Sequence, residues 1–302
     1  MGQKDLAAKQ FESSPAVFAD LINALVYEGE QVILPADLRP APTETLYSAQ
    51  NGVLRNQYND VSKYEIRHGR IKMQYTLENQ SSPDYKILFR KASYEGAIYR
   101  QQYDSKDTYP AIMLVLYWGD AEWNGSSDLF GFFRRRRIHR MARKYIDNIS
   151  LHMYSMKSLP EEIRKRFKSD MRVIVDYLAE GEKYIPGKQK ITDVDGTMRM
   201  LYALTGEMDF IESIGALQEQ QEKGEEVTMG YALSKYKEMG REQGIKEGIR
   251  EGIKEEKIRC AKAFVEETAM QKQPREYVLG ILQTCFQLKE EEALSLYQEG
   301  ML

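Results

Sequence analysis

The stretch IKMQYTLENQ, residues 71–80, predicts the fold more directly than any other part of the sequence. Within it an apolar residue at every second position alternates with a polar one, which is typical of a β-strand with one buried face. The pair His68-Gly69 marks a turn just before this strand. Residues 59–80 are therefore expected to form a hairpin or a meander.

The segments on both sides of this strand complete an α/β unit. Residues 13–29 repeat apolar side chains at helical spacing between a serine N-cap signal and a glycine stop, so they predict an amphipathic helix. Residues 84–103 show a second helical pattern. Residues 111–118, AIMLVLYW, form a continuous apolar run that is typical of a central strand covered on both faces. Residues 35–52 contain three prolines and predict an irregular connection.

The C-terminal half of the chain has a different character. Residues 151–225 have mostly helical patterns, and two short helices broken near Gln287 are expected after residue 274. Between them glycine recurs every fourth residue, at Gly240, Gly244, Gly248 and Gly252. Each glycine in a helix interior costs about 1 kcal/mol relative to alanine. The repeat therefore favours close helix packing, a marginal helix that becomes ordered by self-association through an isoleucine seam, or a flexible linker.

The composition is that of an ordinary globular protein: 302 residues, 42% hydrophobic and 29% charged. It excludes a collagen-like or wholly disordered chain, and no apolar run approaches the ~20 residues that cross a bilayer. The two cysteines, Cys260 and Cys285, cannot form a disulfide framework, and the N-terminus has no apolar signal core. A cytoplasmic location without a membrane partner is therefore expected.

The charge is unevenly distributed along the chain. In total 43 Lys and Arg stand against 46 Asp and Glu, and this net charge of −3 excludes a uniformly basic protein that coats DNA. However, residues 55–100 carry nine basic and five acidic side chains, and residues 134–144 carry seven basic side chains and no acid. A local basic surface is what contacts a phosphate backbone. The composition therefore remains compatible with a nucleic-acid enzyme.

Several other motifs are rejected by their spacing. Residues 193–196, DVDG, start like a calcium loop but lack the third acid and the closing glutamate. His68, His139 and His152 have neither HExxH-like spacing nor cysteine partners, so a zinc site is not expected. The sequence contains no glycine-rich loop ending in Lys-Ser or Lys-Thr and no GxSxG elbow, which argues against a phosphate-loop ATPase and a serine hydrolase.

Polar residues at the end of the 71–80 strand are the candidates for chemistry. Glu78 and Gln80 lie two residues apart and project from the same face of an extended strand. Antiparallel pairing can bring Asp60 beside Glu78, and Asp20 or another acid of the first helix can add a carboxylate. Converging carboxylates make a hard oxygen site suited to Mg²⁺. The ordinary solvent face of a half-buried strand has the same pattern and is the alternative.

Five segments, in order and spacing, resemble those of a known family. They are 18–38 (FADLINALVYEGEQVILPADL), 59–64 (NDVSKY), 77–85 (LENQSSPDY), 89–103 (FRKASYEGAIYRQQY) and 109–125 (YPAIMLVLYWGDAEWNG). Together they are similar to the Rpn family of recombination-promoting nucleases and putative transposases, which belongs to the PD-(D/E)XK nuclease superfamily. The resemblance covers residues 10–135. It implies an α/β fold with a restriction-endonuclease-like αβββαβ core and a mainly helical C-terminal extension.

Residue by residue, the resemblance implies that Asp60, Glu78 and Gln80 are the catalytic residues. Asp60 and Glu78 match the motif acids that hold Mg²⁺, with Mn²⁺ as the alternative ion. The backbone carbonyl of Asn79 adds a metal ligand, and Asp20 matches an additional acid on the first helix. Gln80 stands in place of the motif lysine. Because an amide cannot act as a cation or as a proton acceptor near pH 7, this replacement weighs against full activity.

Further side chains are implied as supporting and DNA-binding groups. Arg90, Tyr94 and Gln101 fall on the helix after the motif, where polar side chains of the family support the site or touch phosphate. We call residues 134–144 the basic block. Its arginines fit phosphate oxygens bidentately. These arginines are Arg134, Arg135, Arg136, Arg137 and Arg140. The alternative for this block is a solvated helix start or loop.

The sequence thus predicts three segments and one preferred function. Residues 10–135 form the nuclease-like domain, residues 136–225 a helical extension, and residues 226–302 the glycine-repeat helix with the terminal helices. The predicted function is that of a Mg²⁺-dependent DNA endonuclease associated with recombination or mobile elements. The alternative is a weakly active or inactive protein of the same fold that binds DNA or acts as a scaffold. Self-association is expected through residues 240–302.

Overall fold

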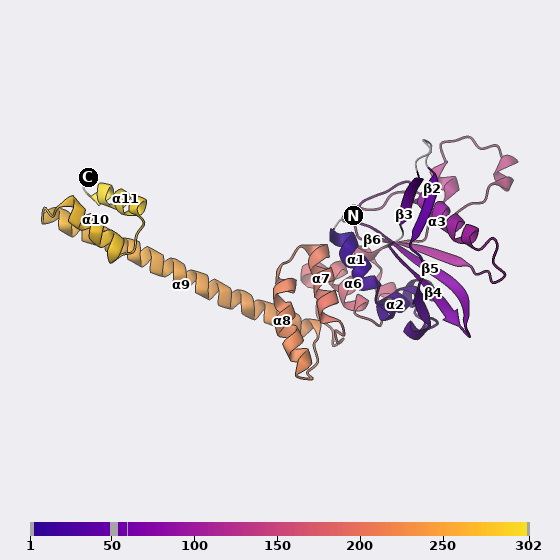
Figure 1. Cartoon of the computed structure of the whole chain (residues 1–302), viewed down its shortest axis with the longest axis horizontal. Helices are drawn as coiled ribbons and strands as arrows, with labels where there is room; N and C mark the ends of the chain where they lie inside the picture. Colours follow the sequence, from indigo (N-terminus) through magenta and orange to yellow (C-terminus); the bar gives the residue numbers. More distant parts are fainter. Residues whose placement is uncertain (1–2, 49–53, 59, 301–302) are drawn as a thin grey trace. The chain divides into compact units, whose positions relative to one another are not determined.

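The computed structural model of the chain describes residues 3–48, 54–58 and 60–300 (Figure 1). The chain forms two compact units, Met1–Ser234 and Lys235–Leu302. The first unit contains every strand of the described residues and all the candidate site residues. Across these described ranges, no helix is both long and apolar enough to cross a membrane.

A five-stranded mixed sheet forms the centre of the first unit. Its strands, in spatial order, are β1 (Leu38–Pro40), β4 (Val61–Arg67), β5 (Arg70–Gln80), β6 (Ala111–Tyr117) and β7 (Met153–Ser155). The pairs β1-β4 and β4-β5 are antiparallel, whereas β5-β6 and β6-β7 are parallel. A separate antiparallel hairpin joins β2 (Glu44–Ser48) to β3 (Leu54–Tyr58).

Helices precede the sheet, cross over it and follow it. The chain begins with α1 (Gln3–Glu12) and α2 (Pro15–Leu25), and α3 (Ile87–Gln101) connects β5 to the parallel strand β6. After β7 come α5 (Glu161–Arg164), α6 (Met171–Glu180), α7 (Val194–Thr205) and α8 (Asp209–Glu222). The order α2, β1, β4, β5, α3 and β6 confirms the predicted αβββαβ core.

Short elements complete the first unit. They are η1 (Pro35–Asp37), η3 (Met156–Ser158), η4 (Gly181–Lys183) and, in the connection from β6 to β7, α4 (Leu129–Phe132) and η2 (Ala142–Tyr145). At the start of α7 the Asp193 carboxylate accepts a hydrogen bond from the Gly196 N–H at 2.9 Å. The rejected calcium-loop motif is therefore a helix N-cap.

The side chains of β6 pack on both faces of the sheet, as the continuous apolar run predicts. Leu114 and Leu116 join the main core with residues of α2, α6 and α7. Met113 and Val115 join a smaller cluster with Ile87 of α3. Figure 1 shows α2 and α6 on one side of the sheet and α3 on the other. Because each fully buried leucine or methionine contributes about 1.5–3 kcal/mol, this strand ties the two helical layers together.

The predicted hairpin is confirmed, and its turn lies at His68-Gly69, as expected. β4 and β5 pair in antiparallel register, with Val61 opposite Leu77. At the turn, His68 has a φ of 52° and Gly69 a φ of 74°. Two successive residues with positive φ give a two-residue turn the twist that matches the flanking strands. His68 is therefore a turn residue, as the sequence predicts.

Three segments differ from the prediction. In the segment 35–52, expected to be irregular, residues 35–48 contain η1, β1 and β2, and residues 49–52 lie outside the described residues. β1 tolerates its proline because it lies at the edge of the sheet. Residues 151–225 are mostly helical, as expected, but they begin with β7, which pairs with β6. Helix α1 has no counterpart among the predicted elements. The division of the chain at residues 135 and 225 stays a prediction.

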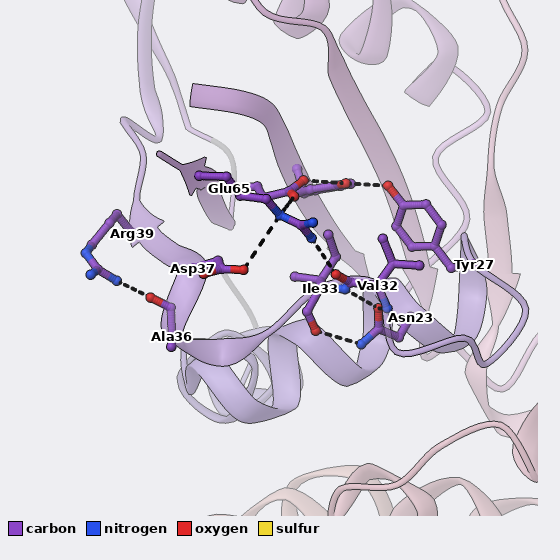
Figure 2. A network of polar contacts seen from close by, with 10 residues as sticks. Asn23, Tyr27, Val32, Ile33, Ala36, Asp37, Arg39 and Glu65 are labelled. Carbon is purple, nitrogen blue, oxygen red and sulfur yellow. Dashed lines mark hydrogen bonds and ion pairs between the residues drawn. The ribbon is translucent and has the colours of Figure 1, made fainter. Parts of the chain in front are cut away.

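A polar network fixes the connection between α2 and the sheet (Figure 2). The side chain of Asn23 donates a hydrogen bond to the carbonyl of Ile33 at 2.9 Å and accepts one from the backbone N–H of Ile33 at 2.8 Å. Arg67 of β4 forms ion pairs with Glu65 at 2.6 Å and with Asp37 at 3.7 Å. Because buried polar groups are costly unless they are paired, these bonds specify one path for the chain from α2 to β1.

The second unit contains the C-terminal part of α9 (Met229–Met270), followed by α10 (Arg275–Thr284) and α11 (Glu290–Gly300). A small core joins these helices through Ala261, Val265, Val278, Leu282 and Leu296. The two predicted tail helices are confirmed, with a left-handed residue, Gln287, between them at a φ of 46°. The glycine repeat lies inside α9 and is helical in the structure.

Candidate active site

Asp60 lies directly before β4, where the β4-β5 hairpin ends. Ser62 pairs with Thr76, so the same register places Asp60 level with Glu78. The Asp60 side chain is buried, and its Oδ2 accepts a hydrogen bond from the backbone N–H of Asn79 at 2.7 Å. The N–H and C=O of one residue in an antiparallel strand point to the same neighbouring strand. The Asn79 carbonyl therefore opens on the side of β5 where Asp60 lies.

Glu78 is 1% exposed and faces α3. Its Oε1 accepts a hydrogen bond from Gln80 Nε2 at 3.2 Å and pairs with the guanidinium of Arg90. Its Oε2 is buried and has no hydrogen-bond partner among the described residues. Burial raises the pKa of Glu78 to about 8, the charge of Arg90 lowers it, and the charge of Asp60 raises it. A buried carboxylate oxygen without a donor is open to a cation.

Helix α1 brings a third carboxylate, Glu12, which the sequence analysis did not identify. Glu12 is fully buried, and its Oε2 accepts a hydrogen bond from Asn79 Nδ2 at 2.7 Å. Trp118 Nε1 donates to Asn79 Oδ1 at 2.7 Å, so one amide joins α1, β5 and the end of β6. Burial raises the pKa of Glu12 to about 8, the Asn79 bond lowers it, and the charge of Asp60 raises it. We call Glu12, Asp60 and Glu78 the acidic cluster.

A signal for Glu12 is present in the sequence. Ala8 and Phe11 lie at helical spacing and are buried, and Glu12 is the last residue of this short helix. An acid is unfavourable at a helix C-terminus, because the macrodipole is negative there. An acid that opposes the dipole at the edge of an apolar face is therefore a candidate for a functional buried carboxylate.

The structure does not bring Asp20 to the acidic cluster. Its carboxylate accepts hydrogen bonds from the backbone N–H groups of Lys168, at 2.9 Å, and Ser169, at 2.8 Å. It also accepts one from the Ser169 hydroxyl at 2.7 Å. These bonds satisfy the turn that precedes α6. The prediction of Asp20 as a metal ligand is corrected accordingly: Asp20 ties α2 to α6, and Glu12 is the N-terminal acid that reaches the cluster.

Arg90 and Tyr94 lie at the acidic cluster, whereas Gln101 does not. Besides binding Glu78, Arg90 pairs with Asp84 at 3.6 Å and donates to the Tyr94 hydroxyl at 3.4 Å. Tyr94 itself is 1% exposed. Gln101 is exposed at the far end of α3, roughly 16 Å along the helix axis from Arg90. The length of α3 carries this predicted supporting residue away from the site.

The basic block lies in the connection from β6 to β7. The backbone N–H of Trp118 donates to the carbonyl of Gln80 at 2.8 Å, so this connection leaves the sheet beside the end of β5. The five predicted arginines are Arg134, Arg135, Arg136, Arg137 and Arg140, and all are exposed. None of them forms an ion pair with an acid of the described residues. Their charges are thus not neutralised within the described parts of the chain.

The acidic cluster offers only part of the ligands of a metal ion. Where the structure describes the chain, no three or more His, Cys, Asp or Glu side chains are grouped so that they could hold a metal. Arg90 already binds one oxygen of Glu78. Mg²⁺ is usually held by one or two carboxylates, and waters and substrate phosphates complete its shell. Asp60 and Glu78 therefore fit a Mg²⁺ site of this open kind, and they do not fit a closed cage of protein ligands.

Comparison with known proteins places this chain in a family. The family described as "Putative transposase, YhgA-like" matches residues 41–207, more than half of the chain. The matched range contains Asp60, Glu78, Arg90 and the basic block. No curated protein and no solved structure matches the chain. The match agrees with the predicted resemblance and supports a role related to transposases and nucleases. The chain belongs to the YhgA-like putative transposase family.

Proposed function

We propose that the protein is a Mg²⁺-dependent endonuclease that hydrolyses phosphodiester bonds of DNA in recombination or in the movement of mobile elements. The family supports the link to transposition. The observation that carries the hydrolytic part is the arrangement at the end of the β4-β5 hairpin. There Asp60 and Glu78 are buried and electrostatically coupled, and Glu78 Oε2 has no partner among the described residues.

Asp60, Glu78 and the backbone carbonyl of Asn79 are the groups that would hold Mg²⁺ or Mn²⁺. When bound, such an ion lowers the pKa of a coordinated water and polarises a phosphoryl oxygen. A carboxyl group whose pKa is raised by burial is ionised by a neighbouring positive charge. Because the pKa of Glu78 is about 8, cation binding near neutral pH would be coupled to the release of a proton.

Arg90 provides a positive charge where the motif lysine is absent. Gln80 donates to Glu78 Oε1, but its amide carries no charge. The guanidinium of Arg90 reaches the same oxygen from α3 and stays protonated at every pH relevant to a folded protein. In the proposed reaction Gln80 orients Glu78 and a water, and Arg90 stabilises the negative charge that develops on the scissile phosphate.

Glu12 and Asn79 act as positioning residues. With a pKa of about 8, Glu12 is mostly protonated near pH 7, so α1 does not place a third full negative charge beside Asp60 and Glu78. The Asn79 side chain is held between Glu12 and Trp118, while its backbone N–H holds Asp60. This arrangement keeps the end of β5 rigid, which is what preorganised catalysis requires.

The basic block is the proposed contact with the DNA backbone. Its arginines are exposed, unpaired among the described residues, and lie in the connection that begins beside the end of β5. Arginine forks fit phosphate oxygens bidentately, and each neutralised phosphate releases counterions. DNA binding would therefore weaken steeply as the salt concentration rises.

A second candidate function is DNA binding by a nuclease fold that no longer cuts. The contact between Arg90 and Glu78 favours it, because Arg90 occupies one Glu78 oxygen without a metal. The presence of Gln80 in place of the motif lysine points in the same direction. In this case the protein would act through DNA binding and self-association alone.

Cleavage of supercoiled plasmid distinguishes the two functions. The full-length protein is incubated with plasmid in Mg²⁺, in Mn²⁺ and in EDTA. The proposal expects nicked or linear product in either metal and none in EDTA, with rates at least roughly 100-fold lower for Asp60→Asn and Glu78→Gln. Glu95→Gln is the matched control, since Glu95 lies on α3 but pairs with Lys91 outside the cluster.

Two outcomes would reject the endonuclease. Equal cleavage by wild type, Asp60→Asn and Glu78→Gln would show that another protein in the preparation cuts the DNA. Binding of the plasmid without cleavage in either metal would leave the second candidate function. Circular dichroism of every variant establishes that a lost activity does not reflect a lost fold.

A further inference from the structure

A pocket beside the end of β5 lies outside the acidic cluster. Its volume is about 670 Å³, within the ~300–1,000 Å³ that is typical of ligand sites. It is lined by Tyr85, which follows β5, and by residues that follow β6, among them Ser126, Ser127, Phe132, Arg134 and Arg135. The segment after β6 is drawn in pink at the upper right of Figure 1. The pocket thus joins an aromatic surface to two arginines of the basic block.

One route of contacts connects this pocket with the end of β6, and another connects it with the acidic cluster. The ring of Tyr117, the last residue of β6, lies 6.0 Å from the ring of Trp123, which in turn lies 5.5 Å from the ring of Tyr85. Along the other route, Asp84 precedes Tyr85 and pairs with Arg90, the residue that binds the catalytic glutamate. The pocket therefore lies at the same end of β5 and β6 as the acidic cluster.

The chemistry of the lining suits a nucleotide. Tyr85 is 50% exposed although its ring contacts Trp123 at an interplanar angle of 31°. Aromatic rings stack with bases of any sequence, because every base has a π-face. Arg134 and Arg135 are exposed and form no ion pair with a described acid, so their guanidinium groups can bind a phosphate. Neighbouring serine hydroxyls add neutral donors and acceptors.

We infer that this pocket binds one nucleotide of an unpaired strand, with its base stacked on Tyr85 and a phosphate between Arg134 and Arg135. A base inside a duplex is paired and stacked on its neighbours, so it must be extruded before it can enter a pocket. The endonuclease would therefore act on single-stranded, flapped or branched substrates in preference to uninterrupted duplex. This preference rests on the proposed function, whereas the binding of an unpaired nucleotide does not.

Binding without cleavage tests the pocket separately from the chemistry. Fluorescence anisotropy with the full-length protein in EDTA compares three labelled probes of one sequence: single-stranded DNA, duplex DNA and single-stranded RNA. Single strands are expected to bind more tightly than the duplex. Tyr85→Ala weakens single-strand binding roughly tenfold, which corresponds to the loss of one stacked base, and leaves duplex binding unchanged. Tyr85→Phe, which keeps the ring, restores binding.

Matched controls separate stacking from general charge. Tyr103→Ala removes another exposed tyrosine, whose ring contacts the Arg100 guanidinium just after the end of α3. This variant is expected to bind the probes as tightly as wild type. The double variant Arg134→Ala/Arg135→Ala weakens the binding of single strand and duplex alike. The double variant Arg70→Ala/Lys72→Ala, at the start of β5, serves as its control. A 2-aminopurine base in the DNA probe loses fluorescence on stacking with wild type and keeps it with Tyr85→Ala.

The outcomes separate the pocket from the endonuclease. Equal affinity for single strand and duplex, with no effect of Tyr85→Ala, overturns the pocket, and the endonuclease stands if plasmid cleavage persists. Binding of single strands that depends on Tyr85, without cleavage in any metal, sustains the pocket and rejects the endonuclease. Tighter binding of RNA than of DNA keeps the pocket and assigns it to RNA. The absence of binding to all three probes overturns the pocket, and plasmid cleavage then decides the endonuclease.

Discussion

The backbone N–H of Asn79 donates a hydrogen bond to Asp60 Oδ2 at 2.7 Å, across the open end of the β4-β5 hairpin. The side chain of the same asparagine bonds Glu12 of α1. One residue thereby fixes an acid through its backbone and another through its amide, while its neighbour Glu78 points to α3. Because a slip of one residue moves every side chain of a strand to the other face, the register of β5 decides whether these acids meet.

The role of Arg90 predicts a rescue by a second substitution. Arg90→Gln removes the cation beside Glu78 and is expected to lower the rate of plasmid cleavage roughly 10- to 100-fold. Gln80→Lys, which restores the motif lysine on β5, is expected to recover most of this loss in the double variant. Single-turnover rates in Mg²⁺ measure both effects. An unchanged rate in Arg90→Gln, or a double variant as slow as the single one, would contradict a catalytic role for this charge.

The buried Glu12 predicts a pH dependence of stability. Its pKa rises from an ordinary value of 4.5 to about 8 on folding, so the folded chain binds more protons than the unfolded chain between these values. The resulting stabilisation is complete below pH 4.5 and is lost as the pH rises through about 8. From about pH 6 to pH 9 in EDTA, wild type is expected to lose roughly 1–3 kcal/mol more unfolding free energy than Glu12→Gln.

Urea unfolding at the two pH values measures this difference. Glu12→Gln keeps the size and the hydrogen-bonding capacity of the side chain but cannot ionise, so it isolates the titration. Two stability curves that run parallel with pH would show that Glu12 does not hold its proton on folding.

The corrected role of Asp20 predicts a loss of stability without a loss of chemistry. Asp20→Ala leaves the backbone N–H groups of Lys168 and Ser169 without their acceptor, and is expected to cost roughly 1–3 kcal/mol of unfolding free energy. Because Asp20 lies away from the acidic cluster, cleavage per folded molecule stays at the wild-type rate. Cleavage that falls as far as in Glu78→Gln, in a variant that remains folded, would return Asp20 to the site.

The expected self-association predicts an effect of the isoleucine seam on α9. Ile245, Ile249 and Ile253 are all more than half exposed, and a Cβ placed on Gly244 or Gly248 would lie within 4 Å of no described atom beyond the neighbouring residues and backbone of α9 itself. Ile249→Lys is expected to shift the full-length chain towards the monomer in sedimentation velocity, because it places a charge in an apolar contact. Equal sedimentation of wild type and Ile249→Lys would place self-association elsewhere or exclude it.

The fold is predictable from sequence where the local pattern matches the burial. The alternation along β5 and the turn at His68 specify a hairpin, and the unbroken apolar run of β6 specifies a strand covered on both faces. β1 and β7 escape prediction because each has only three residues and exists through its pairing with a longer strand. Such short edge strands depend on tertiary contacts more than on propensity.

Only part of the candidate site is predictable from the sequence. The proximity of Asp60 and Glu78 follows from hairpin register, which the sequence pattern specifies. The choice between Glu12 and Asp20 does not, because each is an acid on one of two successive helices and only packing decides which helix meets the end of β5. Gln101 shows a related limit: a helical pattern predicts the face of a residue but not its distance from the site.

A Mn²⁺ titration shows whether Asp60 and Glu78 form one divalent-cation site. Water-proton relaxation and calorimetry near pH 7 measure the binding to the full-length chain and the protons released. One site is expected in wild type and in the control Glu95→Gln, with proton release, and binding is expected to be at least roughly tenfold weaker in Asp60→Asn and Glu78→Gln. No Mn²⁺ binding by wild type, or equal binding by the two variants, would contradict this shared site.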